Sequence, residues 1–280
     1  MLLNSYQSVI CIYFSIEKYF LDVKLWVIIF LNKMEVKGER VAKVIANCGY
    51  CSKREAERLI AEGAVKVNGE VITKPTVFIT DQSIKIHNKL LNRDVKTKMW
   101  LFNKPKGYIV TNNDPQKRKT IYEILPKSLP RVITVGRLDM DTEGLLLLTN
   151  NGDLAKYIAH PSTAWSRQYR VKVHGFLDKI NFEKLEKKGI VIDGVKYAPV
   201  KISIEKESNT TNIWLKVTIK EGKNREVRKI MEYFNLKVMR LIRVSFGPFH
   251  LGKLPSGTVK PVSKQALKDA IGNKVKLNID

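Results

Sequence analysis

The segment GRLDMDTEGLLLLTNNG, residues 136–152, places three carboxylates directly before the most apolar run of the chain. Asp139, Asp141 and Glu143 precede Leu145–Leu148. A continuous apolar run of this length is typical of a strand that is buried on both faces. The Asn-Asn-Gly sequence that follows predicts a turn. We therefore expect the acidic residues on a loop that leads into a core strand, where a side chain is presented rigidly.

The spacing of these carboxylates allows more than one chemistry. Residues two apart in an extended loop point to the same side, so Asp139 and Asp141 could both face a cleft. Two carboxylates of which one is protonated would favour general acid–base chemistry. One ionised Asp held by a cation such as Arg137 is the simplest functional interpretation. A structural loop Asp that bonds backbone N–H groups is the alternative, and it fits Asp141 and Thr142.

The pattern does not favour a metal site. No histidine joins the acidic residues at an interval typical of metal ligands. The chain has three cysteines, Cys11, Cys48 and Cys51, and this low, odd number argues against a disulfide framework and fits a reducing cytoplasm. Cys48 and Cys51 form a C-x-x-C without a second pair nearby, so we interpret them as small residues at a helix end.

The charge balance indicates a polyanionic partner. The 280 residues include 50 Lys and Arg against 27 Asp and Glu, a formal net charge of +23. Such an excess is the electrostatic footprint expected of a nucleic-acid-binding protein.

The region 38–72 reads as two helices followed by a hairpin. Ser52 and Glu55 have the spacing of a capping box at the start of the second helix. Gly63 is placed to end that helix, and Asn68-Gly69 predicts a type I′ turn. Cations near a helix N-terminus oppose the helix dipole and are better explained by an external phosphate. We therefore predict that Lys53, Arg54 and Arg58 bind phosphate groups, such as those of a nucleic acid; a solvated charged face is the alternative.

The first 33 residues differ in character from the rest. They are apolar and aromatic, but charged residues such as Glu17, Lys18 and Asp22 interrupt them before the roughly 18 residues that a membrane span needs. No basic stretch precedes the apolar part, as a secretory signal would require. We interpret residues 1–33 as an extension upstream of a natural start at Met34; a membrane-associating segment is the alternative.

Two known families resemble this chain. GERVAKVIANCGYCSKREAERLIAEGAVKVNGEVI, residues 38–72, resembles an S4 RNA-binding domain. The stretch quoted at the outset resembles the signature of RNA pseudouridine synthases, in the S4-bearing branch that modifies ribosomal RNA. NKPKGYIVTNNDP, HPSTAWSRQYRVKV and EGKNREVRKIMEYF resemble that family's flanking motifs and occur in the family's order.

The resemblance implies a fold and a domain plan. The fold class is α+β: a small S4 domain is followed by a catalytic domain with a mixed, mainly antiparallel sheet. The expected boundaries are 36–92 for the S4 domain, 99–265 for the catalytic domain and 266–280 for a C-terminal tail.

Site residues are implied in the same way. The family's reactive Asp corresponds to Asp139, its base-stacking Tyr to Tyr169, and the cation that pairs with the Asp to Arg228. The substrate pocket is expected to include Arg137, Leu138 and Leu241. Two positions depart from the family pattern: Arg167 stands where the family often has Lys, and Glu226 where it usually has Gln.

The implied reaction needs neither a cofactor nor a metal, because uridine and pseudouridine are isomers. A flipped base loses stacking worth a few kcal/mol, and stacking on Tyr169 would restore about 1–3 kcal/mol. The residues leave open whether Asp139 bonds C1′, C6 or neither, and a glycal route that removes a proton from C2′ is also open.

We thus expect a cytoplasmic, monomeric isomerase that acts on ribosomal RNA or a pre-ribosomal particle, without a membrane. Large-subunit RNA is the favoured substrate by overall likeness. The alternatives are the same chemistry on small-subunit RNA and a non-catalytic S4-type RNA-binding or ribosome-assembly protein.

Overall fold

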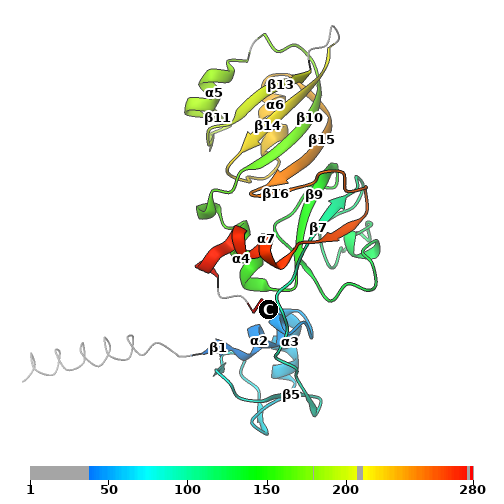
Figure 1. Cartoon of the computed structure of the whole chain (residues 1–280), viewed down its shortest axis with the longest axis vertical. Coiled ribbons are helices and arrows are strands. Elements are labelled where there is room, and N and C mark those ends of the chain that lie inside the picture. Colours follow the sequence, from blue (N-terminus) through cyan, green and yellow to red (C-terminus); the bar gives the residue numbers. More distant parts are fainter. Residues whose placement is uncertain (1–37, 179, 207–210, 276–277, 280) are drawn as a thin grey trace, which may run out of the picture. The chain divides into compact units, whose positions relative to one another are not determined.

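The computed structural model describes residues 38–178, 180–206, 211–275 and 278–279 (Figure 1). The chain packs into two compact units. One comprises the chain up to Val44 together with Ala56–Leu91, and the other comprises Ile45–Glu55 and Asn92–Asp280. The predictions for residues 1–33 and for Met34 lie outside the described residues.

Residues 38–91 form short helices and strands, with one sheet in the order β3-β2-β5-β6 and a β1–β4 pair. Asn68 and Gly69, between β2 and β3, have φ values of 48° and 92°, which confirms the predicted type I′ turn. Ser52 Oγ accepts a hydrogen bond from Glu55 N at 3.0 Å, as predicted for the helix start. The bounds are β1 (Glu39–Arg40), α2 (Val41–Asn47), α3 (Lys53–Ala61), β2 (Val65–Val67), β3 (Glu70–Ile72), β4 (Phe78–Ile79), β5 (Ile84–Ile86) and β6 (Lys89–Leu90).

The second unit is built on one large sheet in the order β13-β14-β10-β15-β9-β7-β17, with β16 beside β15 and β8 beside β9. Its pairs are antiparallel except for β15 with β9. The predicted α+β class with a mixed, mainly antiparallel sheet is confirmed. A separate pair is formed by β11 and β12. The strands of the unit are β7 (Met99–Lys104), β8 (Ile133–Thr134), β9 (Thr142–Thr149), β10 (Arg167–His174), β11 (Ile190–Ile192), β12 (Val195–Tyr197), β13 (Lys201–Lys206), β14 (Asn212–Ile219), β15 (Lys237–Phe246), β16 (Phe249–His250) and β17 (Val259–Pro261).

Helices cover this sheet. In Figure 1, α6 lies against the β10, β14 and β15 part of the sheet, where it packs on β15, and α4 packs on β9. The helices are η1 (Ile121–Glu123), α4 (Gly152–Ala159), η2 (Pro161–Thr163), α5 (Phe182–Lys188), α6 (Glu226–Tyr233), α7 (Lys264–Ile271) and η3 (Gly272–Lys274). Leu267 and Ile271 of α7 are buried in the core of this unit. The expected limit between catalytic domain and tail, at residue 265, therefore falls inside a packed helix.

The parallel contact between β9 and β15 is the feature that positions the acidic loop. Thr142–Gly144 pair with Leu241–Arg243, two segments about a hundred residues apart in the chain. Gly144 has a φ of 99°, and a Cβ there would lie 2.3 Å from Arg243 O. Only glycine allows this backbone approach. The loop before β9 is thereby fixed next to the middle of β15.

Within the described ranges, no helix is long and apolar enough to cross a membrane.

Candidate active site

The loop that carries Asp139 is held by a buried lysine. Lys104, the last residue of β7, is fully buried. Its Nζ donates to the backbone oxygens of Thr142 at 2.9 Å, Pro105 at 3.0 Å and Asp139 at 3.1 Å. Burial lowers the pKa of Lys104 to about 8, although three nearby carboxylates raise it. This residue was missed by the sequence analysis; its signal is a lysine that ends an apolar strand.

The three carboxylates of the opening segment have separate surroundings. Asp139 lines a cavity of about 170 Å³, and Asp141 does not line it. The two carboxylates, which the spacing would have allowed to face one cleft, are therefore separated, because the chain turns at Met140–Asp141 before β9 begins. Glu143 pairs with Arg240, whose Nε and Nη2 lie 2.9 and 2.8 Å from its oxygens. Only Asp139 of these three is presented to the cavity.

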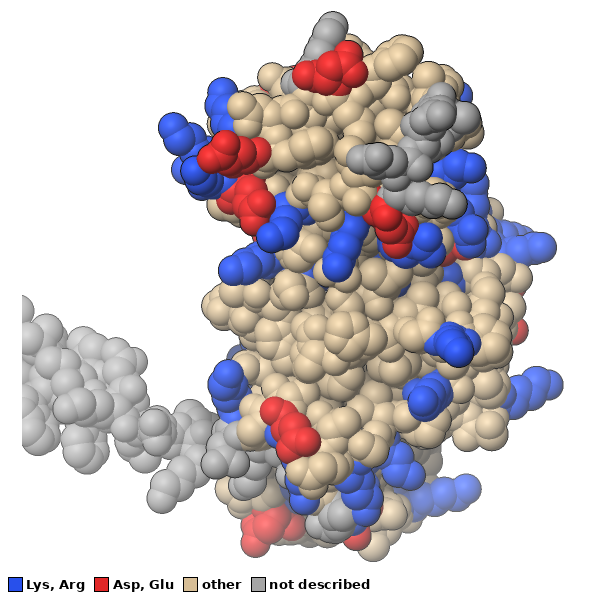
Figure 2. Space-filling view, turned by 45° about the horizontal axis from the view of Figure 1, so that its top comes forward, with Lys and Arg blue, Asp and Glu red and all other residues tan. Residues whose placement is uncertain are grey.

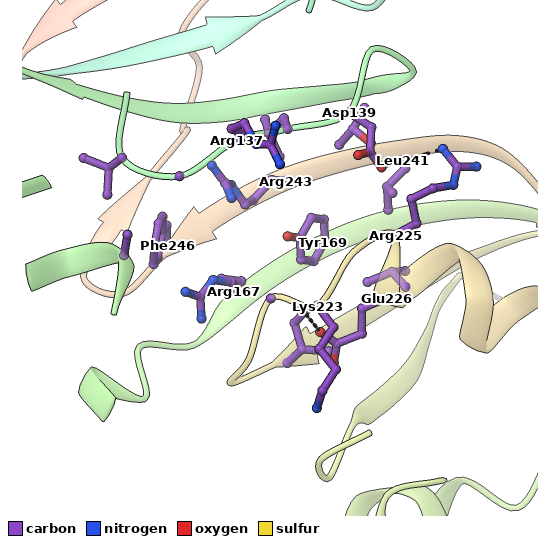
Figure 3. A pocket seen from close by; sticks show the side chains of 18 residues that line it. Arg137, Asp139, Arg167, Tyr169, Lys223, Arg225, Glu226, Leu241, Arg243 and Phe246 are labelled. Carbon is purple, nitrogen blue, oxygen red and sulfur yellow. Dashed lines mark hydrogen bonds and ion pairs between the residues drawn. The ribbon is translucent and has the colours of Figure 1, made fainter. Parts of the chain in front are cut away.

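Several predicted residues meet at this cavity. Arg137, Leu138, Asp139, Tyr169 and Leu241 all line it. Figure 3 shows the ring of Tyr169 in the middle of the labelled side chains, with Leu241 and Asp139 on the side of the β9 loop. Tyr169 is 8% exposed, so its ring is a fixed platform.

The cations around Asp139 differ from the expected arrangement. Arg228 was expected to pair with Asp139, but its Nη2 donates to the backbone oxygen of Asp141 at 3.0 Å. The ion pair at Asp139 is formed instead by Arg225, with Nη1 at 3.9 Å from Oδ2 (Figure 3). Burial and the neighbouring Arg225 lower the pKa of Arg228, whereas the carboxylates of Asp141 and Asp139 raise it. Arg228 thus lies within electrostatic range of Asp139 and holds its loop.

The reason for this arrangement is local. Arg225 has a left-handed φ of 52° at the residue before α6. That turn places Arg225 at the cavity, whereas Arg228 lies one helical turn further on and is buried. The sequence did not predict Arg225, because no sequence periodicity indicates that an arginine adopts a left-handed backbone conformation.

Two further arginines line the cavity and were not predicted as site residues. Arg167 and Arg243 are buried, and their guanidinium carbons lie 4.6 and 5.0 Å from the ring centroid of Phe246. Such distances are typical of cation–π contacts. Arg243 is also the cross-strand neighbour of Tyr169. One end of the cavity is therefore strongly positive.

Glu226 is a second carboxylate at the cavity. It is 3% exposed, and its Oε2 accepts a hydrogen bond from Lys223 N at 2.9 Å. Burial raises the pKa of Glu226 to about 7; the hydrogen bond from Lys223 opposes this rise, and the nearby Glu221 adds to it.

Among the described residues, no group of three His, Cys, Asp or Glu could hold a metal ion. Cys51 is a free thiol.

The cations predicted to bind RNA are exposed on α3. Arg58 forms an ion pair with Glu62, at 2.9 Å between Nη1 and Oε1. On the face shown in Figure 2, lysine and arginine side chains are widely spread, with fewer acidic side chains between them. All three predicted cations are accessible to a phosphate backbone: Lys53, Arg54 and Arg58.

Comparison with known proteins identifies the family. Residues 98–233 match the RNA pseudouridylate synthase model, and residues 39–80 match the S4 domain. A protein of Rickettsia typhi described as an uncharacterized RNA pseudouridine synthase is 46% identical over 86% of this chain and 98% of its own length. The chain belongs to the RNA pseudouridine synthase family.

Other similarities agree with this assignment. The ribosomal large subunit pseudouridine synthase B of Bacillus subtilis is 37% identical over 82% of this synthase and 94% of its own length. A crystal structure of a pseudouridylate synthase covers 83% of this chain and 99% of its own, with 26% identity and a TM-score of 0.59. The predicted resemblance is confirmed: this RNA pseudouridine synthase carries an S4 domain and isomerises uridine in RNA.

Proposed function

We propose that the enzyme converts a specific uridine of large-subunit ribosomal RNA to pseudouridine, with Asp139 as the reacting carboxylate. The observation that carries this proposal is the placement of Asp139: it is the one carboxylate of its loop that lines the cavity, and Tyr169 lines the same cavity. Lys104 Nζ holds that loop at the backbone oxygens of Asp139, Met140 and Thr142, and we call these three hydrogen bonds the Lys104 clamp. Positioning of this kind is what a reacting group requires.

The other side chains have roles that follow from their positions. The target base leaves its stack and stacks on Tyr169, with Leu241 as an apolar wall. Arg225 and Arg228 supply positive charge that balances the Asp139 carboxylate. Asp139 then attacks C1′ or C6, or stabilises the positive charge that develops at C1′. The C5–C1′ bond replaces the N1–C1′ bond, so the reaction consumes no co-substrate.

The choice of large-subunit RNA is supported by the relatives that carry this description, such as that of Bacillus subtilis. In this proposal residues 36–92 form the S4 domain and supply affinity through Lys53, Arg54 and Arg58, and residues 99–265 carry the chemistry. The enzyme is proposed to act on free ribosomal RNA or a pre-ribosomal particle.

The test is a map of pseudouridines in both ribosomal RNAs from a strain that lacks this gene. The proposal expects one modification to disappear from large-subunit RNA and to return when the gene is restored. Purified enzyme should introduce the same modification into a transcript of that RNA. Loss of a site in small-subunit RNA would support the alternative substrate, and unchanged maps with intact RNA binding would support a non-catalytic role.

A further inference from the structure

Arg243 is a buried arginine that lines the cavity and has no part in the reaction proposed above. It lies in β15, is 3% exposed and lines the cavity with Asp139 and Tyr169. Its Nε donates to Leu145 O at 2.7 Å, which fixes the guanidinium in place. Its Nη2 has no hydrogen-bond partner among the described residues. A buried donor without an acceptor is destabilising, so this atom points to an acceptor that arrives with the substrate.

The charge of Arg243 is also left without a counter-ion. In the part of the chain that the structure describes, neither Arg243 nor the neighbouring Arg167 forms an ion pair. Arg167 satisfies Nη1 with the backbone oxygens of Trp165 and Lys220, at 3.0 and 3.1 Å. Burial lowers the pKa of Arg243, and the phenol oxygen of Tyr169 opposes this. A guanidinium nonetheless stays protonated in proteins, so this end of the cavity attracts negative charge.

The isomerisation produces negative charge on the base. When the N1–C1′ bond breaks, its electron pair stays with the uracil and spreads over N1, O2 and O4, while C1′ becomes electron-poor. If Asp139 adds to C6 instead, the electron pair of the C5–C6 double bond moves onto O4. The N1–C1′ bond then breaks in this route too. In either route the base turns, C5 bonds to C1′, any bond that Asp139 has formed to C1′ or C6 breaks, C5 loses its proton and N1 gains one. Each route places negative charge on a uracil carbonyl oxygen, which Asp139 cannot stabilise.

We propose that Arg243 is a catalytic residue that donates a hydrogen bond from Nη2 to a carbonyl oxygen of the flipped uracil and stabilises the negative charge formed there. The register supports this position, because Arg243 is paired across the sheet with Tyr169, the proposed stacking platform. Figure 3 shows the Tyr169 hydroxyl directed to the side where Arg243 and Arg167 lie. The inference rests on the proposed function, since it takes Asp139 and Tyr169 as the site.

The test compares uracil with 5-fluorouracil as the base that leaves C1′. Full-length Arg243→Gln and Arg243→Lys are assayed under single turnover on a short RNA that contains the mapped target uridine, and on the same RNA with 5-fluorouridine at that position. Consumption of the target nucleoside is followed by nuclease digestion and chromatography. Fluorine withdraws electrons and stabilises the uracil anion. Lys237→Gln is the matched control, because Lys237 is on the same strand, is exposed and does not line the cavity.

Arg243→Gln should slow the uridine reaction by about 10²–10³-fold, as removal of an oxyanion donor does, while RNA affinity changes less than about twofold. Arg243→Lys should lose less, and the loss in both variants should be at least about fivefold smaller on 5-fluorouridine. Lys237→Gln should keep the wild-type rate on both RNAs. An equal loss on the two RNAs would mean a merely structural role and would overturn the inference. If Arg243→Gln fails to fold, Arg243→Lys decides by the same comparison.

Failure of the proposed function has a different signature. If the wild-type enzyme leaves the uridine unchanged, the assigned reaction on this RNA is wrong and this inference falls with it. If the wild type converts the uridine and Arg243→Gln does so at a similar rate, only the role of Arg243 is wrong.

Discussion

Glu226→Gln should stabilise the enzyme at pH 8 and leave its stability nearly unchanged near pH 5. Glu226 is buried at the cavity, and burial raises its pKa from the usual 4.5 to about 7. Gln stands at this position in the family motif that this segment resembles. It keeps the size and an acceptor oxygen for Lys223 N, and it adds N–H donors that do not depend on pH.

The sign follows from proton binding. Between pH 4.5 and 7 the folded state holds a proton on Glu226 that the unfolded state has released. The contribution of the Glu226 carboxyl to the free energy of unfolding is therefore fully present below pH 4.5 and is lost as the pH rises through about 7. A shift of this size corresponds to about 3 kcal/mol, and we expect about 1–3 kcal/mol because the pKa of the neighbouring Glu221 is shifted in the opposite direction.

The assay is urea unfolding at intervals between pH 5 and pH 8, followed by circular dichroism. The difference in unfolding free energy between Glu226→Gln and wild type should grow with pH and level off above about pH 7. Glu232→Gln, on the exposed side of the same helix, is the control and should show a constant difference. A constant difference for Glu226→Gln would refute the reasoning, because the carboxyl would then titrate alike in both states.

The remaining predictions concern the acidic loop, its clamp, the S4 surface and the chain start. Asp139→Ala should abolish pseudouridine formation, measured as tritium release from C5-labelled RNA, with RNA binding nearly intact. Asp141→Ala should lose far less, because its bond to Arg228 uses the backbone oxygen; the reverse result would show that the wrong carboxylate is assigned. Lys104→Met should lower the unfolding free energy by about 2–4 kcal/mol, since three backbone oxygens of the loop lose a charged donor, and unchanged urea unfolding would contradict the clamp. When Ala replaces Lys53, Arg54 and Arg58, the slope of log binding constant against log salt concentration should fall by the equivalent of up to about three phosphate contacts. An unchanged slope would exclude this surface. A chain that starts at Met34 should be fully active, so loss of activity would contradict the interpretation of residues 1–33.

Local patterns predicted the parts of the structure that local forces determine. The Asn68-Gly69 turn follows from the backbone preferences of two residues. The strand through Leu145–Leu148 follows from an apolar run that must be buried, and it places Asp139 just before a core strand. These features need no knowledge of distant contacts.

The parts that were missed depend on distant contacts. Lys104 holds residues about 35 positions further along the chain, and Arg243 meets the loop only because β15 runs parallel to β9. A buried charge has no periodic signal, because its stability depends on acceptors that other elements bring. The motif indicates Arg228, but the turn at Arg225 decides which cation lies 3.9 Å from Asp139.

The three acidic residues make different contacts, and this explains why so basic a chain has them together in one loop. Glu143 is bound to Arg240, and the backbone of Asp141 holds Arg228, so each is tied to an arginine of another element. These ties, together with the Lys104 clamp, fix the loop from three sides. The remaining carboxylate, Asp139, is held through its backbone oxygen, which leaves its side chain presented to the cavity. A loop fixed by its neighbours leaves its reacting group available to the substrate, which is the condition that a preorganised site must meet.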